Sequence, residues 1–380
     1  MAMKKMALRE LVIIQSGQSP SSLQLSRVGG LPYVKVEDMN NCQKYQISSR
    51  EYTNDGSCAV PKGSIIFPKR GAAIMNNKVR IAERELCMDT NMMAIIPNEK
   101  VLSEFLYYSI INAQLFKIAD TSTIPQINNK HINPYKIILP TIEIQEKMVE
   151  LLSIWDYAIE KTERLITAKE KQYLWLLSNL ISNDKHQHVH IRDFAFEVST
   201  RNNGTAIDLV LSVTNNRGFV LPSDQFERRV ASSDLSNYKI VTRGQYAYNP
   251  SRINVGSIAR LDGWDKGVLS PMYVVFELNE KKVNSDYFLH WLESHEGKEH
   301  IRNSAQGSVR ETVSFTDFGA ISFPLPSINE QGKIAAVLNM ARNEIDLIKR
   351  QLEACRQQKR GLMQKLLTGQ WRVKTNTEEM

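Results

Sequence analysis

The side chains best suited to chemistry are polar and basic groups gathered in two pairs of loops. The first pair is "PKRGAAIMNNKVR" at 68–80 and "ADTSTIPQINNKHIN" at 119–133; the second is "NPSRINVGSIAR" at 249–260 and "AQGSVRETVSFTDFG" at 305–319. Arg and Lys suit phosphates and guanine edges, whereas Asn and Gln suit adenine edges. The predicted DNA contacts are Lys69, Arg70, Asn76, Asn77, Lys78, Thr121, Ser122, Thr123, Gln126, Asn128, Lys130, Asn249, Ser251, Arg252, Asn254, Gly307, Ser308, Arg310 and Thr312.

No motif of a catalytic site accompanies these loops. The sequence has no Gly-rich phosphate loop with lysine, no His-Glu-x-x-His and no nucleophile elbow. "YNPS" at 248–251 lacks the second proline and the aromatic of an amino-methyltransferase motif. "HQHVH" at 186–190 could place three histidines on one side of a strand, but we interpret it as a solvated linker. We therefore predict no catalytic, cofactor-binding or metal-binding residue.

Composition is compatible with a folded protein that binds a polyanion. The chain has 380 residues, 42% hydrophobic and 23% charged, which indicates two or more domains. Its formal charge of +7 raises the prospect of a nucleic-acid partner. No apolar run is long enough to span a membrane, and the N-terminus does not resemble a signal peptide. Four separated cysteines, without a Cys-x-x-Cys pair, favour a reducing cytoplasm.

The elements that must position the loops are revealed by an internal repeat. "LPTIEIQEKMVELL" at 139–152 returns as "LPSINEQGKIAAVL" at 325–338, an offset of 186 positions without a gap. The stretches ahead of these motifs also correspond, since 60–74 resembles 241–255 and 98–108 resembles 279–290. Both halves contain β-rich runs, at 65–67 and 94–96 and at 245–248 and 273–276, followed by a helix at 102–118 or 284–303. A self-similarity of this kind predicts a duplicated architecture.

Each repeated motif opens a long helical pattern. Apolar residues recur at alternating steps of four and three, which is the seam of a coiled coil. Each helix would be about 40 residues and roughly 60 Å long, so the two would stabilise each other by packing antiparallel. Each begins after Leu-Pro, and Gly369 is placed to cap the second. The predicted packing residues are Met148, Leu152, Trp155, Ile159, Ile166, Leu176, Leu180, Ile334, Leu338, Ile345, Ile348, Leu352, Leu362 and Leu366.

The predicted fold is α+β, with two globular α/β domains alternating with two long helices in a pseudo-twofold repeat. The predicted domains are a first recognition domain at 1–140, a spacer helix at 141–183, a second recognition domain at 184–326, a spacer helix at 327–370 and a tail at 371–380.

The chain resembles the specificity subunits of type I restriction-modification systems over essentially its whole length. The spacer opening "PLPSINEQGKIAAVL" at 324–338, its end "KRGLMQKLLTGQW" at 359–371 and the loop "GSVRETVS" at 307–314 are similar to that family. The first copy departs from the pattern, because Thr121 stands in place of the loop glycine and Ile144 in place of the acidic Glu330.

The resemblance implies a non-catalytic DNA-recognition subunit in the cytoplasm. Each globular domain would recognise half of a bipartite double-stranded DNA target, and the helices would fix the gap between the halves. Two methyltransferase subunits and the restriction subunits would be its partners, and AdoMet, ATP and Mg²⁺ would be bound only by them. Because the loops of the two halves differ, the target is predicted to be asymmetric.

Two alternatives remain open from the residues alone. One is a stand-alone DNA-binding scaffold or regulator of the same architecture that has no methyltransferase partners; co-purification would separate it from a specificity subunit. The other is a self-contained restriction or modification enzyme, which would need a catalytic motif that the sequence does not contain.

Overall fold

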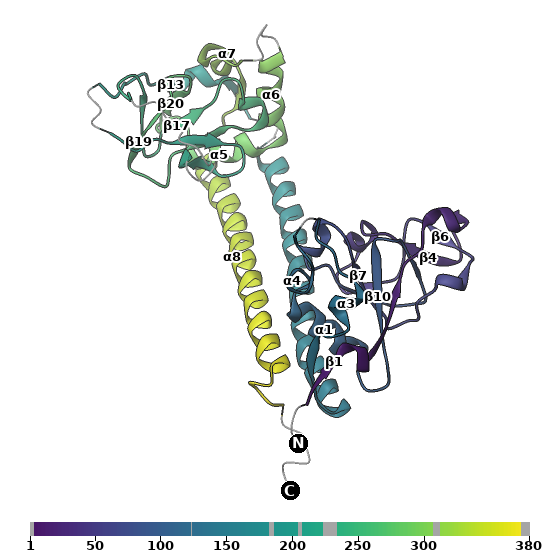
Figure 1. Cartoon of the computed structure of the whole chain (residues 1–380). Helices are drawn as coiled ribbons and strands as arrows, with labels where there is room; N and C mark the ends of the chain where they lie inside the picture. The colour runs from purple at the N-terminus through teal and green to yellow at the C-terminus, as the bar shows by residue number, and fades with distance from the viewer. Residues whose placement is uncertain are drawn as a thin grey trace. The chain divides into compact units, whose positions relative to one another are not determined.

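A computed structural model describes residues 4–122, 124–181, 186–203, 207–222, 234–306 and 312–373. The chain forms two compact units, residues 1–163 with 351–380 and residues 164–350. Each unit therefore combines one globular part with a segment of each of two long helices, α4 (Ile142–Ile181) and α8 (Ile328–Leu367) (Figure 1). The domain boundaries drawn at the helix ends stay a prediction.

Unit 1 is built on a five-stranded sheet of order β2-β10-β7-β8-β5, and a smaller sheet has the order β3-β6-β4-β9. A separate pair, β1-β11, joins the start of the chain to the strand that leads into α4. The elements are β1 (Lys4–Ala7), β2 (Val12–Ser16), β3 (Leu25–Ser26), β4 (Leu31–Val34), β5 (Tyr45–Gln46), β6 (Tyr52–Thr53), β7 (Ile65–Pro68), β8 (Arg80–Ala82), β9 (Cys87–Met88), β10 (Met92–Pro97), α1 (Ser103–Ala113), α2 (Leu115–Ile118), α3 (Asn129–Ile132) and β11 (Lys136–Leu139).

Unit 2 repeats this arrangement with a sheet of order β13-β20-β17-β18 and a pair β12-β21 that leads into α8. Two further pairs, β14-β15 and β16-β19, are antiparallel. The elements are β12 (His188–His190), β13 (Ala195–Glu197), β14 (Ser212–Thr214), β15 (Gly218–Val220), β16 (Lys239–Thr242), β17 (Tyr246–Tyr248), β18 (Ile258–Arg260), β19 (Lys266–Leu269), β20 (Val274–Leu278), α5 (Ser285–Glu293), α6 (His295–Gln306), α7 (Phe315–Gly319) and β21 (Ser322–Pro324). The duplication seen in the sequence is thus visible in the main sheet and in the strand pair before each long helix, whereas the described residues of unit 2 form two strand pairs in place of the smaller sheet of unit 1.

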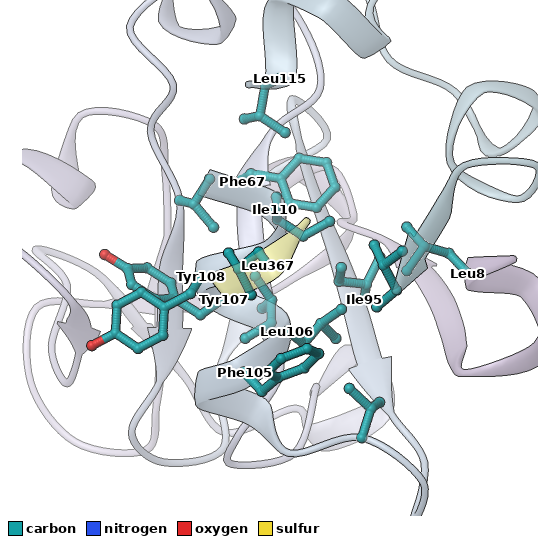
Figure 2. Packing of buried hydrophobic residues seen from close by; sticks show 14 of the residues in the cluster. Leu8, Phe67, Ile95, Phe105, Leu106, Tyr107, Tyr108, Ile110, Leu115 and Leu367 are labelled. Carbon is teal, nitrogen blue, oxygen red and sulfur yellow. The ribbon is translucent and has the colours of Figure 1, made fainter. Parts of the chain in front are cut away.

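Each long helix contributes to the hydrophobic core of a globular part at both of its ends. In unit 1, Met148 and Leu152 of α4 and Leu367 of α8 are buried with residues of the sheet and of α1. Figure 2 shows Leu367 among Phe105, Ile110 and their neighbours. In unit 2 the equivalent core contains residues from the end of α4 and the start of α8. These are Leu177 and Ile181 of α4 and Ile334, Ala335 and Leu338 of α8.

A buried glutamine fixes the start of α4. The side chain of Gln145 is fully buried, and its Oε1 accepts a hydrogen bond from the amide of Leu102 at 2.9 Å. Its Nε2 donates to the carbonyl oxygens of Lys100 and Pro140, both at 3.0 Å. One side chain therefore ties the Leu-Pro turn and the helix to the segment that precedes α1.

The second copy makes the same three bonds. Gln331 is fully buried; its Oε1 accepts from the amide of Asn284 at 2.8 Å, and its Nε2 donates to the carbonyl oxygens of Lys282 and Pro326 at 3.1 and 2.9 Å. A buried amide that satisfies three backbone groups is costly to replace, which accounts for glutamine at this position in both repeats.

Within unit 1, ion pairs set the direction of the two helices. Asp156 of α4 pairs with Lys359 of α8, and two turns further on Glu163 pairs with Arg356 at 2.6 Å. The residue number rises along α4 while its partner's number falls along α8. The segments are therefore antiparallel.

The same direction holds within unit 2. Lys169 of α4 pairs with Glu344 at 2.8 Å, and the hydroxyl of Tyr173 accepts a hydrogen bond from Arg342 of α8 at 2.8 Å. The predicted antiparallel coiled coil is therefore confirmed.

The structure places every predicted packing residue of the two helices at a buried or half-buried position. Four further residues are buried although they lie outside the predicted pattern of alternating four- and three-residue steps: Leu177, Ile181, Met363 and Leu367. The reason is that each helix end faces a globular domain as well as its partner helix, so a second stripe of side chains is covered. Gly369 follows α8 with a φ of 72°, which confirms the expected C-terminal cap.

The helix predicted over 102–118 is wrong as a single element. It breaks at Gln114, which has a φ of 62°, and continues as α2. The side chain of Asn77 bridges the break, donating to the carbonyl oxygen of Ile111 and accepting from the amide of Leu115, both at 2.9 Å.

The helix predicted over 284–303 is also two helices, α5 and α6. The break lies at Ser294, whose backbone is extended and whose hydroxyl accepts a hydrogen bond from the amide of Gly297 at 3.0 Å. In both halves the helix can break at this point because a side chain forms hydrogen bonds with backbone groups that the break leaves without helical partners.

Candidate nucleic-acid interface

In unit 1 the two predicted loops meet at the end of β7. The amide of Ile127 donates to the carbonyl oxygen of Lys69, and the amide of Gly71 donates to that of Pro125, both at 2.9 Å. Residues 69–78, 119–122 and 124–130 thus come together, and we call them the first loop junction. Its polar side chains come from segments about fifty residues apart, so local sequence patterns do not predict their proximity.

In unit 2 the second loop junction, residues 249–256 with 312–313, is closed by the equivalent bond. The amide of Val313 donates to the carbonyl oxygen of Pro250 at 3.1 Å. Ile127 and Val313 occupy matching places in the repeat, and both are fully buried. The same backbone scaffold therefore carries two different sets of exposed side chains.

The first loop junction is basic at its centre. Lys69 is half-buried beside the exposed Arg70. Burial, together with the positive charge of Arg70, lowers the pKa of Lys69 from its usual value. An anion between two adjacent cations offsets their mutual repulsion, which suits a phosphate group.

The neighbouring amides and hydroxyls of this junction are ordered by local bonds. Gln126 donates to the side-chain oxygen of Asn128 at 3.2 Å. The carboxylate of Asp120 accepts hydrogen bonds from both the amide and the hydroxyl of Ser122. Thr121 and Lys130 are exposed in the same loop.

Not every predicted contact residue of the first pair of loops is available to DNA. The amide group of Asn77 is occupied at the break between α1 and α2. Lys78 is half-buried and donates to the side-chain oxygen of Asn40 at 2.5 Å. Asn76 is exposed. Thr123 lies outside the described residues.

The second loop junction presents Ser251 and Arg252, both exposed. Asn249 accepts a hydrogen bond from the amide of Ser251 at 3.0 Å, which shapes the turn. Asn254 and Thr312 are half-buried. Gly307, Ser308 and Arg310 of the second predicted loop lie outside the described residues.

A groove that the sequence did not indicate opens beside the second loop junction. It is a cavity of about 990 Å³ between the β14–β15 hairpin, β18 and helices α5 and α6. Asn254, Asn215, Arg217, Lys298 and Arg302 are among its lining residues. Its polar lining includes the "TNNRG" turn at 214–218, which no local sequence pattern connects to the predicted loops.

The described residues include no group of three or more His, Cys, Asp or Glu side chains that could hold a metal ion. His188 lies 3.8 Å from a carboxylate oxygen of Glu296, and His190 is bonded to the carbonyl oxygen of Ala320. Neither α4 nor α8, nor another helix in the described part of the chain, has an apolar stretch that would span a bilayer.

The family model of the type I restriction modification DNA specificity domain matches residues 2–170 and 234–356. The chain belongs to this family. The match confirms the resemblance that the spacer motifs indicate. Specificity subunits are non-catalytic components of restriction-modification complexes.

Two relatives come from Methanocaldococcus jannaschii. The chain is 29% identical over 183 residues to the type I restriction enzyme MjaIX specificity subunit, which covers 45% of this chain and 42% of that one. It is 23% identical over 389 residues to the putative type I restriction enzyme MjaX specificity subunit, covering 94% and 86%. The first match therefore spans less than half of either protein, whereas the second spans most of both.

The fold is shared with solved specificity subunits. The S subunit of a type I restriction-modification system from M. genitalium superposes with a TM-score of 0.58 at 16% identity, over 96% of both chains. A chain from a structure of type I complex assembly and conformational transition gives a TM-score of 0.59 at 14% identity, covering 96% and 97%. The specificity-subunit architecture is thus preserved at low sequence identity.

Proposed function

We propose that this specificity subunit recognises an asymmetric, bipartite DNA target, with one half-site contacted by each loop junction. The observation that carries the proposal is the repeated closing hydrogen bond, Ile127 to Lys69 and Val313 to Pro250, beneath different exposed side chains. Identical scaffolds support the same mode of docking, while different side chains select different bases.

Recruitment of two copies of one partner is supported by apolar residues that recur at matching positions. Leu151 and Ile154 of α4 are 40% and 59% exposed, and Val337 and Met340, 186 positions later, are 46% and 73% exposed. The members of each pair are three residues apart and share a helix face. We propose that each pair docks one methyltransferase subunit.

The partners supply the chemistry in this proposal. Restriction subunits join the methyltransferase complex, and AdoMet, ATP and Mg²⁺ are bound by those subunits rather than by this chain. The complex would act on chromosomal DNA in the cytoplasm.

The deciding experiment is a methylome. Long-read sequencing of host DNA, with and without this gene, should reveal methylated adenines in a split, non-palindromic site only when the gene is present. A continuous or palindromic site would contradict the asymmetric target. An unchanged methylome would favour the stand-alone scaffold, a conclusion that co-purification without methyltransferase subunits would support.

A further inference from the structure

We propose that the groove of unit 2 binds the phosphodiester backbone of the DNA strand that flanks the half-site contacted by the second loop junction. The inference rests on the proposed function and assigns a role to Lys298 and Arg302 of α6, which lie outside the predicted loops. The groove is defined by Asn215–Gly218, Ile253–Gly256, Lys298 and Arg302.

The groove is continuous with the second loop junction. The turn Ile253–Val255, which follows Arg252, lines the groove, and α6, which also lines it, packs against this turn. Along the chain, α6 ends at Gln306, where the predicted loop 305–319 begins. DNA that contacts Ser251 and Arg252 therefore passes the mouth of the groove.

Its charge suits a polyanion. Lys298 and Arg302 are exposed and lie one helical turn apart on α6. Ile301 between them is buried and also lines the groove, so this face of α6 is turned toward it. Neither cation has an ion pair among the described residues. Both can therefore bind phosphates without first breaking an internal contact.

The acidic groups of the groove are already neutralised. Asp262 pairs with Arg260 at 2.8 Å, and Glu293 pairs with Arg342. Their charges are thus offset within the protein, and the unpaired cations on α6 determine what the groove attracts.

The distribution of polar groups favours the backbone over a base. The side chains of Lys298 and Arg302 are exposed, whereas the apolar lining residues Ile253 and Leu292 are buried and Ile258 is half-buried. A sugar-phosphate chain offers charges at the edge and apolar sugars between them. Contacts of this kind fix the register of the protein on DNA without selecting a base.

The test uses the complex co-purified with its methyltransferase subunits and a duplex that carries the target found in the methylome. In the double variant Lys298→Gln/Arg302→Gln, the slope of log affinity against log salt should fall by about 1.8, since each phosphate contact contributes about 0.9. Affinity at 0.1 M salt should fall roughly 60-fold by the same relation. The target sequence should stay unchanged in the methylome.

A matched control removes two exposed lysines of the same unit that line no part of the groove, Lys266→Gln/Lys281→Gln. It should leave the salt slope within error of the wild type. The inference is overturned if the groove variant keeps the wild-type slope, if the control loses as much, or if the groove variant alters the bases that are recognised. Failure of the wild-type complex itself to bind the duplex would instead refute the proposed function.

Discussion

At the residue scale, one buried amide in each repeat joins three backbone segments. Gln145 and Gln331 each satisfy one amide and two carbonyl groups that would otherwise be buried without partners. The repeat places these two glutamines at matching positions but does not indicate their role, because two of the three partners of each lie more than forty residues away in the chain.

Replacing Gln331 should therefore destabilise the protein. Gln331→Ala leaves the amide of Asn284 and two carbonyl oxygens unpaired, at a cost of about 2–4 kcal/mol. Gln358→Ala, at an exposed position of the same helix, is the control and should change stability by less than about 0.5 kcal/mol. Urea unfolding measures both, and equal midpoints would contradict the assigned role.

A second residue-scale feature is the buried His290. It bonds to Asn339 at 2.9 Å and to the hydroxyl of Tyr173 at 3.1 Å. Burial lowers its pKa from 6.5 to about 4, aided by the positive charge of Arg342 and opposed by Asp286. The ring is therefore neutral in the folded protein at pH 7.

Stability should fall as the pH drops from about 6.5 toward 4, because the unfolded state takes up a proton there that the folded ring resists. Above pH 6.5 this contribution is fully present. His290→Gln cannot titrate, so the difference in unfolding free energy between wild type and variant should shrink over that window. Chemical unfolding at several pH values tests it; a difference that does not vary with pH would refute it.

At the element scale, the two repeats place different chemistry at matching positions of the helices. Asp156 accepts hydrogen bonds from Tyr108 and Lys44 and pairs with Lys359. Its counterpart in the repeat is Arg342, which contacts Tyr173 and Glu293. The duplication therefore preserved the geometry of the junction between helices and globular domain while the sign of the charge was reversed.

The exposed apolar pairs on the helices lead to a stoichiometric prediction. Val337→Gln/Met340→Gln should lower the co-purified methyltransferase from two copies to one, and Leu151→Gln/Ile154→Gln should do the same. Combining the four changes should remove both copies. Unfolding free energies should stay near wild type, because all four side chains are exposed.

Native mass spectrometry of the co-purified complexes gives the copy number directly. The control is Leu174→Gln, which removes an exposed apolar side chain of α4 that belongs to neither pair and should retain two copies. Loss of both partner subunits from either double variant alone would contradict a docking site on each helix.

At the scale of the whole molecule, the chain contains two related units whose loop junctions expose different side chains. A change in one loop junction should then alter only one half of the target. If Arg252 contacts a guanine, Arg252→Ala should weaken recognition of its half-site by about 1–3 kcal/mol and relax the preference at one position.

The methylome of this variant is the measurement. The other half-site should stay unchanged, and Arg243→Ala, an exposed arginine paired with Asp265, is the control. Altered bases in both halves would contradict independent recognition.

The sequence by itself determined the duplication, the two long helices and the absence of known catalytic motifs. These features are local: the four-three ladder and the Leu-Pro starts are set by side-chain spacing and backbone restriction within a few turns. Apolar runs also predict the strands at 65–67 and 94–96, which are β7 and β10.

Only the tertiary structure decided how the loops meet. The bonds from Ile127 to Lys69 and from Val313 to Pro250, and the groove beside Asn254, join segments more than thirty residues apart. Tertiary context also broke the two predicted helices at Gln114 and Ser294, where side chains satisfy the freed backbone groups. Long-range packing and hydrogen bonding leave no periodic trace in the sequence, and they form the two loop junctions.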